Sequence, residues 1–310
     1  MKSFFLPAGL LLAFALAWIL PEVGTFLNEI GLVPWLMVII FVINGYQIKL
    51  SEIPREFNFL YALLATAVIS LLIAPFIGAQ AAQLFGLSTA ATLGLIVKST
   101  VPATLSTCIV MTQIAGGHAL WALVMTVVLN ILGVFTIPFM LSLNVSAIGE
   151  ITVDPFPLLQ TLMLFVLVPL LAGFFAKRIL SISADHLVLQ YLPSSCVILT
   201  VWIMLSASAA VFKSLDLFLL IQIGVAAISV HFLLMIICWA AARGMKLERG
   251  ALIAMIFTGS QKTLPVAVGV LSALNQPIGI AVLVCICFHF LQLFADSLII
   301  GRMVQAKNSG

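Results

Sequence analysis

The sequence predicts an all-α polytopic membrane protein with ten transmembrane helices, arranged as two inverted repeats of five helices. Three observations lead to this fold class: a very apolar composition, ten apolar stretches of spanning length, and an uneven distribution of lysine and arginine between the loops. Hydrophobic residues make up 64% of the 310 residues and charged residues only 7%, against about 25% charged residues in soluble domains. The chain therefore belongs in a lipid bilayer.

Charge and motif content disfavour several other classes. The formal net charge of +3 is too small to indicate a nucleic-acid partner. Five cysteines lie within apolar stretches, without the spacing of a zinc site or a disulfide framework, so we interpret them as small core residues. Because the sequence contains no HExxH, GxSxG or paired-acid motif, we expect neither an enzyme nor a cofactor.

Ten stretches have the roughly 20 apolar residues that a transmembrane helix needs. The first has the basic start and apolar run of a signal peptide, but it lacks a small-residue cleavage site, so we interpret it as a helix. Connections between the stretches are short, and no soluble domain is expected. In chain order the stretches cover residues 4–20, 32–48, 58–84, 88–112, 117–143, 155–176, 190–212, 216–242, 249–273 and 277–302.

The distribution of basic residues predicts that both termini lie in the cytoplasm. With the N-terminus inside, ten basic residues fall in cytoplasmic segments, one falls outside, and two lie within spans. With nine or eleven spans, basic residues would no longer be confined to the loops on one side of the membrane. The cytoplasmic residues are Lys2, Lys49, Arg55, Lys177, Arg178, Arg243, Lys246, Arg249, Arg302 and Lys307; the outer one is Lys213, and Lys98 and Lys262 lie within spans.

The linker at residues 144–155 divides the ten spans into two sets of five, residues 1–147 and 148–310. Because five is odd, the second set must run inverted relative to the first. Inverted repeats are a recurrent plan of secondary transporters, in which discontinuous helices from the two halves meet near the membrane midplane. We therefore expect the same helix to be interrupted in each of the two repeats.

Helices four and nine have such interruptions. Each has apolar ends and a small, polar, proline-containing middle with one lysine. Pro102 and Pro265 remove an amide donor, and the carbonyls they free are tolerated only inside protein or beside a wet cavity. Hydroxyl groups around the two breaks supply further candidate ligands: Thr100, Thr104, Ser106, Thr107, Thr258, Ser260 and Thr263. A proline kink whose hydroxyls bond only their own backbone is the structural alternative.

Lys98 and Lys262 are the sharpest signal in the chain. Both lie about 15–20 Å deep, near the midplane, from the rise of a helix per residue. An ammonium group there costs at least ~2.5–3.5 kcal/mol, so it needs a partner or must titrate. Ammonium groups retained beside a substrate crevice favour anions, and an organic anion is the expected substrate class.

Polar stripes on helices five and ten are candidate partners for these lysines. Asp296 is the only acid within a span, and it shares a helical face with His289 and Gln292. Thr126 and Asn130 are four residues apart on helix five. We expect both stripes to face helices four and nine, as a charge partner or as helix-packing contacts. His118 and His231 are given no chemical role.

The motifs "KSTVPATLSTCIVMTQIAGGHALWALVMTVVLN" and "FTGSQKTLPVAVGVL" resemble the bile acid/sodium symporter superfamily, in its SBF-like branch of bacterial membrane proteins. The resemblance implies a core domain of helices three to five and eight to ten, in which broken helices four and nine cross. Helices one, two, six and seven would form a panel domain, with substrate in the crevice between the domains. It also implies the bacterial inner (cytoplasmic) membrane as the location.

The resemblance also points to the positions of sodium ligands. Thr107 and Cys108 fall where sodium-coupled members have a polar pair after the helix-four break. Thr126 matches a helix-five hydroxyl, and Gln261 matches the helix-nine glutamine. The resemblance thus implies that these four positions surround the ion site.

Two positions depart from that pattern. The helix-nine acid falls at Phe257, and the glutamine of helix three falls at Ser70. A site without its carboxylate loses its main compensation for a hard cation. We expect the ammonium of Lys262, next to Gln261, to supply a built-in charge there, permanently or by reversible protonation, and Lys98 to do the same from the other repeat.

The resulting prediction is a secondary active transporter of a small organic anion that works by alternating access, sodium-independent or proton-linked. Three alternatives stay open: a sodium-coupled organic anion symporter, a cation/proton antiporter, and a non-transporting membrane regulator of ion homeostasis. The antiporter is disfavoured because such proteins usually display one or two midplane carboxylates, and this chain has only Asp296. Coupling to Na+ or H+ and contact with the lipid bilayer are the only other partners expected, and the sequence gives no oligomeric state.

Overall fold

The structure is a computed structural model that describes residues 2–48, 54, 56–105, 107–146, 153–180, 186–208, 216–274 and 279–308. Regular structure in these residues is entirely helical. In chain order the elements are α1 (Lys2–Ile19), α2 (Pro21–Glu29), α3 (Leu32–Gln47), α4 (Phe57–Ala67), the π-helix η2 (Val68–Ile73), α5 (Ala74–Leu84), α6 (Thr89–Thr100), α7 (Thr107–Ile114), α8 (Ala119–Ser146), α9 (Pro155–Leu162), the π-helix η3 (Met163–Leu167), α10 (Val168–Ala176), α11 (Leu187–Ala207), α13 (Leu217–Gly244), α14 (Arg249–Ser260), α15 (Leu264–Ala273) and α16 (Gly279–Asn308).

Six segments among the described residues are long and apolar enough to cross a membrane, and a seventh counts if α1 and α2, bent by 98°, form one span. The six are Phe57–Leu84, Ala119–Ser146, Pro155–Ala176, Leu217–Gly244, Arg249–Ala273 and Gly279–Met303. The protein is therefore a multi-pass membrane protein, as the composition predicted. α3 and the Tyr191–Ala207 part of α11 are apolar but shorter, so the count of ten spans stays a prediction.

Two of the long spans contain a π-helical turn. η2 lies between α4 and α5, and η3 lies between α9 and α10. In both cases a proline, Pro75 or Pro169, occupies the first turn of the helix that follows. Because a proline ring clashes with the carbonyl one turn earlier and lacks an amide hydrogen, a widened π turn accommodates it without ending the helix.

Two other helices are fully interrupted. α6 ends at Thr100 and the next residue, Val101, is extended, with ψ of 153°. α14 ends at Ser260, and Gln261 (ψ 147°) and Thr263 (ψ 140°) are extended before α15 begins. Pro265 lies in the first turn of α15, where a helix tolerates proline. The predicted breaks in helices four and nine are therefore present.

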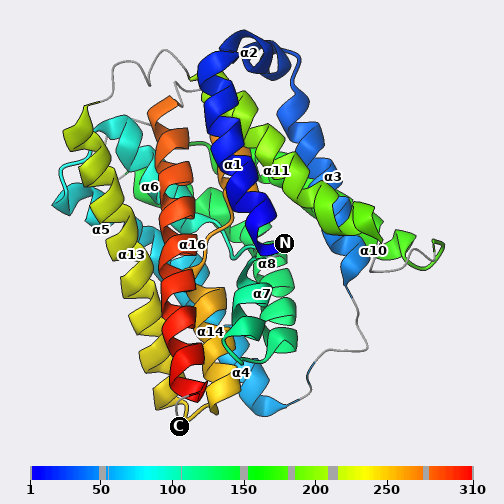
Figure 1. Cartoon of the computed structure of the whole chain (residues 1–310), viewed down its shortest axis with the longest axis vertical. Helices are drawn as coiled ribbons and strands as arrows, with labels where there is room; N and C mark the ends of the chain where they lie inside the picture. The colour runs from blue at the N-terminus through cyan, green and yellow to red at the C-terminus, as the bar shows by residue number, and fades with distance from the viewer. Residues whose placement is uncertain are drawn as a thin grey trace.

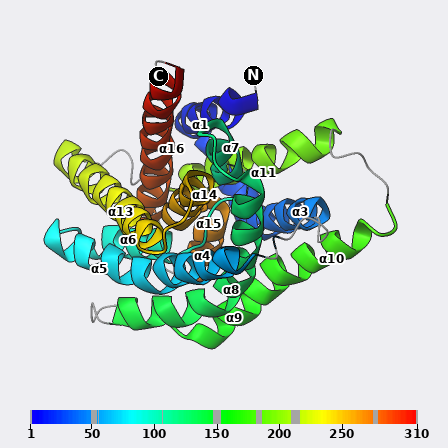
Figure 2. The same ribbon diagram turned by 90° about the horizontal axis from the view of Figure 1, so that it is seen from below.

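The helices form two groups that meet at these breaks. α3 packs on α10 and α11, and α11 packs on α1 and α2, at one side of the molecule (Figure 1). α16 packs on α6 and α13, and α14 packs on α13 and α8, at the other side. Of the six long segments, Arg249–Ala273 has the largest share of buried residues, 89% over an 18-residue stretch, and Figure 2 shows α14 and α15 in the middle of the bundle. The broken helix is thus at the protein centre.

Candidate functional site

The two extended breaks lie beside each other. The amide of Thr263 donates a hydrogen bond to the carbonyl of Pro102 over 2.8 Å. Asn130, on α8, donates to the carbonyl of Ala103 in the same break over 3.1 Å and to that of Thr126 over 2.8 Å. Backbone groups that the breaks expose are therefore satisfied within the protein, as the hydrocarbon environment requires.

Lys98 and Lys262 are completely buried where the two breaks meet. Lys98 Nζ donates to the carbonyl oxygen of Lys262 over 2.9 Å and lies 5.9 Å from the centre of the Phe288 ring. Lys262 Nζ donates to the carbonyl and the hydroxyl oxygens of Ser70, over 2.6 Å and 3.0 Å. Ser70 lies in η2. Lys98 Nζ is thus bonded to an oxygen of the second break, and Lys262 Nζ to two oxygens of η2.

Asp296 contacts a histidine and a glutamine. His231 Nε2, on α13, lies 2.9 Å from Asp296 Oδ1, and both side chains are fully buried. Gln261 Nε2 donates to Asp296 Oδ2 over 2.7 Å. The sequence predicted either a lysine as the charge partner of Asp296 or a helix-packing contact; among the described residues its two oxygens contact His231 and Gln261. The histidine was missed because nothing in its own helix places it opposite α16.

Gln292, on α16, forms hydrogen bonds with the backbone of the second break. Its Oε1 accepts from the amide of Lys262, and its Nε2 donates to the carbonyl of Lys262, both over 3.0 Å. Its Nε2 also lies 3.1 Å from Nδ1 of His289. In a neutral ring this contact leaves the proton on Nε2 of His289, which is buried and has no hydrogen-bond partner among the described residues.

A third set of contacts joins α7 to the second break. Thr107 Oγ1 donates to Gln261 Oε1 over 3.0 Å and lies 2.6 Å from Thr104 Oγ1. Cys108 Sγ lies 3.1 Å from Thr126 Oγ1 and 3.9 Å from Thr258 Oγ1. The structure therefore gathers most of the candidate site residues in one network.

The side chain of one candidate lies outside that network. Ser260 Oγ is buried and has no hydrogen-bond partner in the part of the chain that the structure describes. Ser106 lies outside the described residues.

A narrow crevice runs beside the breaks, with a volume of about 60 Å³. Helices α3 and α11 form one wall, and the breaks, α15, α8 and α16 form the other. Its lining residues are Ile40, Phe41, Asn44, Thr104, Leu105, Asn130, Pro193, Ser194, Val197, Thr263, Leu264, Pro265 and His289. The crevice thus joins the two helix groups at the place where a substrate site was expected.

Comparison with known families decides the class of protein. Residues 4–305 match the model of the SBF-like CPA transporter family. The chain belongs to this family. It is therefore a membrane transporter and not an enzyme, and the resemblance drawn from the break motifs is confirmed.

Relatives of this SBF-like transporter occur in plants and bacteria. The chain is 27% identical to "Probable sodium/metabolite cotransporter BASS4, chloroplastic" of Oryza sativa subsp. japonica, over 97% of this chain and 75% of the relative. It is 26% identical to the protein of the same name in Arabidopsis thaliana, over 96% of this chain and 72% of the relative. An uncharacterized protein of Pseudomonas aeruginosa is 26% identical, over 70% of this chain and 66% of the relative.

The side chains that the resemblance matched to sodium ligands make hydrogen bonds within the protein. The hydroxyl of Thr107 and the amide oxygen of Gln261 form one pair, and the oxygens of Ser70 accept from Lys262. Phe257, at the position of the acid, is 1% exposed and supplies no oxygen. Hard cations prefer several oxygen ligands including carboxylates. Phe257 thus leaves its own position without a carboxylate, and the carboxylate that contacts Gln261 is that of Asp296.

Proposed function

We propose that the protein is a secondary active transporter that moves a small organic anion by alternating access, independently of sodium or linked to protons. In this proposal Lys262 occupies the position where sodium-coupled members of the superfamily hold an ion. Its ammonium supplies the positive charge that the ion supplies in those proteins. A fixed charge makes transport sodium-independent, and a reversibly protonated one makes it proton-linked.

One observation carries the proposal: the bonds from Lys262 Nζ to the carbonyl and hydroxyl oxygens of Ser70. Ser70 stands at the position of the helix-three glutamine, and Lys262 directly follows the matched glutamine, Gln261. The ammonium therefore bridges two elements that contribute to the ion site in the superfamily. A π turn often marks a functional position in a helix, and Ser70 belongs to η2.

The crevice favours an anionic substrate. α15 begins at its wall, and the N-cap residue Thr263 makes no side-chain cap bond. A helix N-terminus carries a partial positive charge and free amides, which suit a carboxylate. His289, whose Nε2 has no hydrogen-bond partner among the described residues, lines the same space. The volume of about 60 Å³ favours a small anion.

We also propose that the chain has ten spans in two inverted repeats, 1–147 and 148–310, and that these form a core domain and a panel domain. The equivalent breaks after α6 and α14, each with a buried lysine, support it. The boundary itself falls in residues 147–152, outside the described residues. We further propose a bacterial inner membrane location with both termini in the cytoplasm, from the basic residues of the loops.

A sodium-coupled anion symporter is the second candidate. The relatives from Oryza sativa and Arabidopsis thaliana are named probable sodium/metabolite cotransporters, which favours it. The two candidates differ in whether sodium is required when the same anion is transported.

An anion screen tests the proposed function. The purified protein is incubated with small monocarboxylates, dicarboxylates and sulfonates, and those that raise the melting temperature are tested for uptake into proteoliposomes in sodium and in choline buffers. Ser194→Trp fills the crevice from α11, whereas Leu298→Trp changes a lipid-facing side chain that is 54% exposed. We expect uptake in choline buffer for wild type and Leu298→Trp, and none for Ser194→Trp.

Two results would contradict this account. Uptake that requires sodium would favour the symporter. Stabilisation and uptake that persist unchanged in Ser194→Trp would mean that the crevice is not the substrate site.

A further inference from the structure

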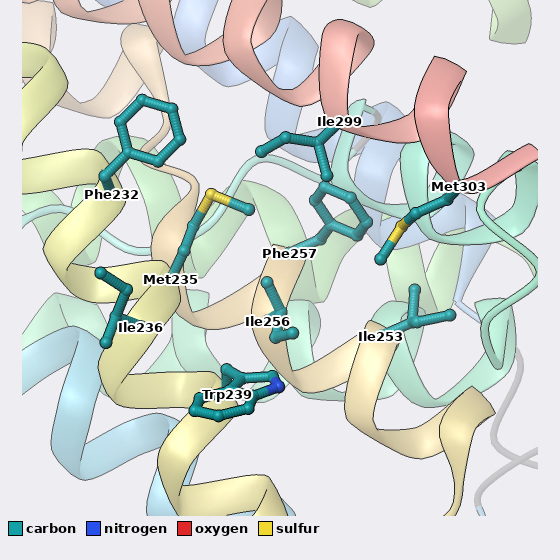
Figure 3. Close-up of a pocket in the computed structure, with 9 residues that line it drawn as sticks. All are labelled: Phe232, Met235, Ile236, Trp239, Ile253, Ile256, Phe257, Ile299 and Met303. Atoms are coloured by element: carbon teal, nitrogen blue, oxygen red, sulfur yellow. The ribbon is translucent and has the colours of Figure 1, made fainter. Parts of the chain in front are cut away.

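A larger apolar groove lies away from the polar network, between α13, α14 and α16. Its volume is about 190 Å³, and every lining side chain is apolar. Figure 3 shows these side chains pointing into one shared space from the three helices. They are Phe232, Met235, Ile236 and Trp239 on α13, Ile253, Ile256 and Phe257 on α14, and Ile299 and Met303 on α16.

The outer part of this groove faces the lipid. Ile236 is 57% exposed and Trp239 50% exposed, whereas Phe257 at its floor is 1% exposed. In hydrocarbon an apolar wall gains little from contact with one apolar partner over another, because lipid tails are as apolar as leucine. The groove can therefore accept an acyl chain, but any preference for one lipid must come from polar groups at its mouth.

Three exposed arginines lie at one end of the groove-forming helices, one on each helix. Arg243 lies in the last turn of α13 and its guanidinium is 5.9 Å from the centre of the Trp239 ring. Arg249 begins α14, one turn before Ile253, and Arg302 precedes Met303 on α16. The lower ends of these helices gather beside the C-terminus in Figure 1.

The charge at this end is complementary to a phosphate group. Guanidinium groups bind phosphate through paired donors, and basic pockets between transmembrane helices bind anionic headgroups. The neighbouring acid, Glu248, lies 3.1 Å from His118 Nε2. Stacking on Trp239, an amphipathic ring of the kind enriched at membrane interfaces, keeps the guanidinium of Arg243 beside the groove.

We propose that this groove binds an anionic phospholipid of the leaflet at this end of the helices. One acyl chain lies among the side chains of α13, α14 and α16, and the phosphate contacts Arg243, Arg249 and Arg302. The bound lipid braces the contact between α13 and α14, and α14 leads directly to the second break. This inference does not depend on the substrate or on the coupling ion.

Native mass spectrometry of the detergent-purified full chain tests the proposal, with dioleoyl-phosphatidylglycerol and dioleoyl-phosphatidylcholine as probes. The two lipids share their acyl chains, so a difference in affinity reports the headgroup. From the attraction of each arginine near a membrane surface we expect phosphatidylglycerol to bind about tenfold more tightly or better. Glycerol 3-phosphate, a headgroup without chains, is the third probe and is expected not to bind measurably.

Three variants separate the parts of the site. The double substitution Arg243→Gln and Arg302→Gln is expected to abolish the preference for phosphatidylglycerol. Met303→Trp, which fills the groove, is expected to lower the affinity for both lipids. Arg178→Gln is the matched control, because this arginine also stacks on aromatic rings, Phe174 and Phe175, but at the end of α10. We expect it to bind as wild type does.

Several outcomes would overturn the proposal. One is equal binding of the two lipids by wild type, and another is a preference that survives the double substitution. Full binding of glycerol 3-phosphate would identify a soluble phosphate site instead of a lipid site. Loss of the preference in Arg178→Gln to the same degree would point to general surface charge.

Discussion

Two lysines and one aspartate are completely buried at the level of the breaks, and each has a defined set of partners. Lys98 and Lys262 donate to carbonyl oxygens, and Asp296 contacts His231 and Gln261. An unpaired charge in hydrocarbon is costly, so these partners explain how the fold tolerates the residues. The carbonyl of Lys262 serves two donors, Lys98 Nζ and Gln292 Nε2, and is therefore central to the network.

Gln292→Leu is expected to destabilise the protein. The substitution removes the acceptor of the Lys262 amide, while the Lys262 carbonyl keeps its bond from Lys98. One buried amide left without a partner costs about 2 kcal/mol. Unfolding in mixed micelles measures the loss, with the exposed Gln113→Leu on α7 as control, for which we expect a change within about 0.5 kcal/mol. Equal stability of Gln292→Leu and wild type would contradict the assigned role.

At the scale of single residues, the sequence predicted which residues form the site, but not which hydrogen-bond partners they have. Lysine in the middle of an apolar, proline-containing span is rare enough to mark Lys98 and Lys262 directly. The partners depend on which helices are neighbours, and no periodicity within one helix contains that information. His231 was missed for this reason. The chain has one acid within a span, however, and an isolated histidine in another span could have been predicted as its partner.

Close helix contacts in this molecule depend on glycines as much as on large apolar side chains. A Cβ added at Gly45 of α3 would overlap the carbonyl of Leu170 on α10, and one added at Gly173 of α10 would overlap the carbonyl of Val42 on α3. Small residues let membrane helices approach closely. The two positions face each other across one contact, so α3 and α10 pack backbone against backbone.

Gly173→Ala is expected to destabilise this contact by about 1–3 kcal/mol, because overpacking forces the helices apart. Gly244→Ala at the end of α13 is the matched control, since a Cβ there meets no atom within 4 Å, and it is expected to be neutral or slightly stabilising. Thermal unfolding of the two variants in the same detergent makes the comparison. A Gly173→Ala protein as stable as the control would show that α3 and α10 separate easily.

Helix positions could be predicted largely from apolar length, because the bilayer sets that length. The breaks after Thr100 and Ser260 were also predicted, from proline with polar neighbours. The π turns η2 and η3 were not, because proline in a span predicts a distortion without specifying its kind. The 98° bend between α1 and α2 was not predicted either, because the first apolar stretch was interpreted as a single helix over residues 4–20.

The whole molecule joins two helix groups around one crevice, and the breaks form part of its wall. Family membership makes the protein a transporter, and the crevice lies between the two helix groups. The crevice itself could not be predicted from the sequence, because its lining comes from five helices and the two breaks. The two lysines near the crevice could be predicted, because their depth within an apolar span is evident from the sequence.

Replacement of sodium chloride by choline chloride at constant ionic strength tests the central claim most directly. Melting temperatures of wild type and Lys262→Ala are measured in both salts. An ion at about 100 times its dissociation constant stabilises a protein by ~2.7 kcal/mol, which is readily detected. The account predicts no sodium effect in wild type and a sodium-dependent rise in Lys262→Ala, where the ammonium has gone. Stabilisation of the wild type by sodium would contradict it.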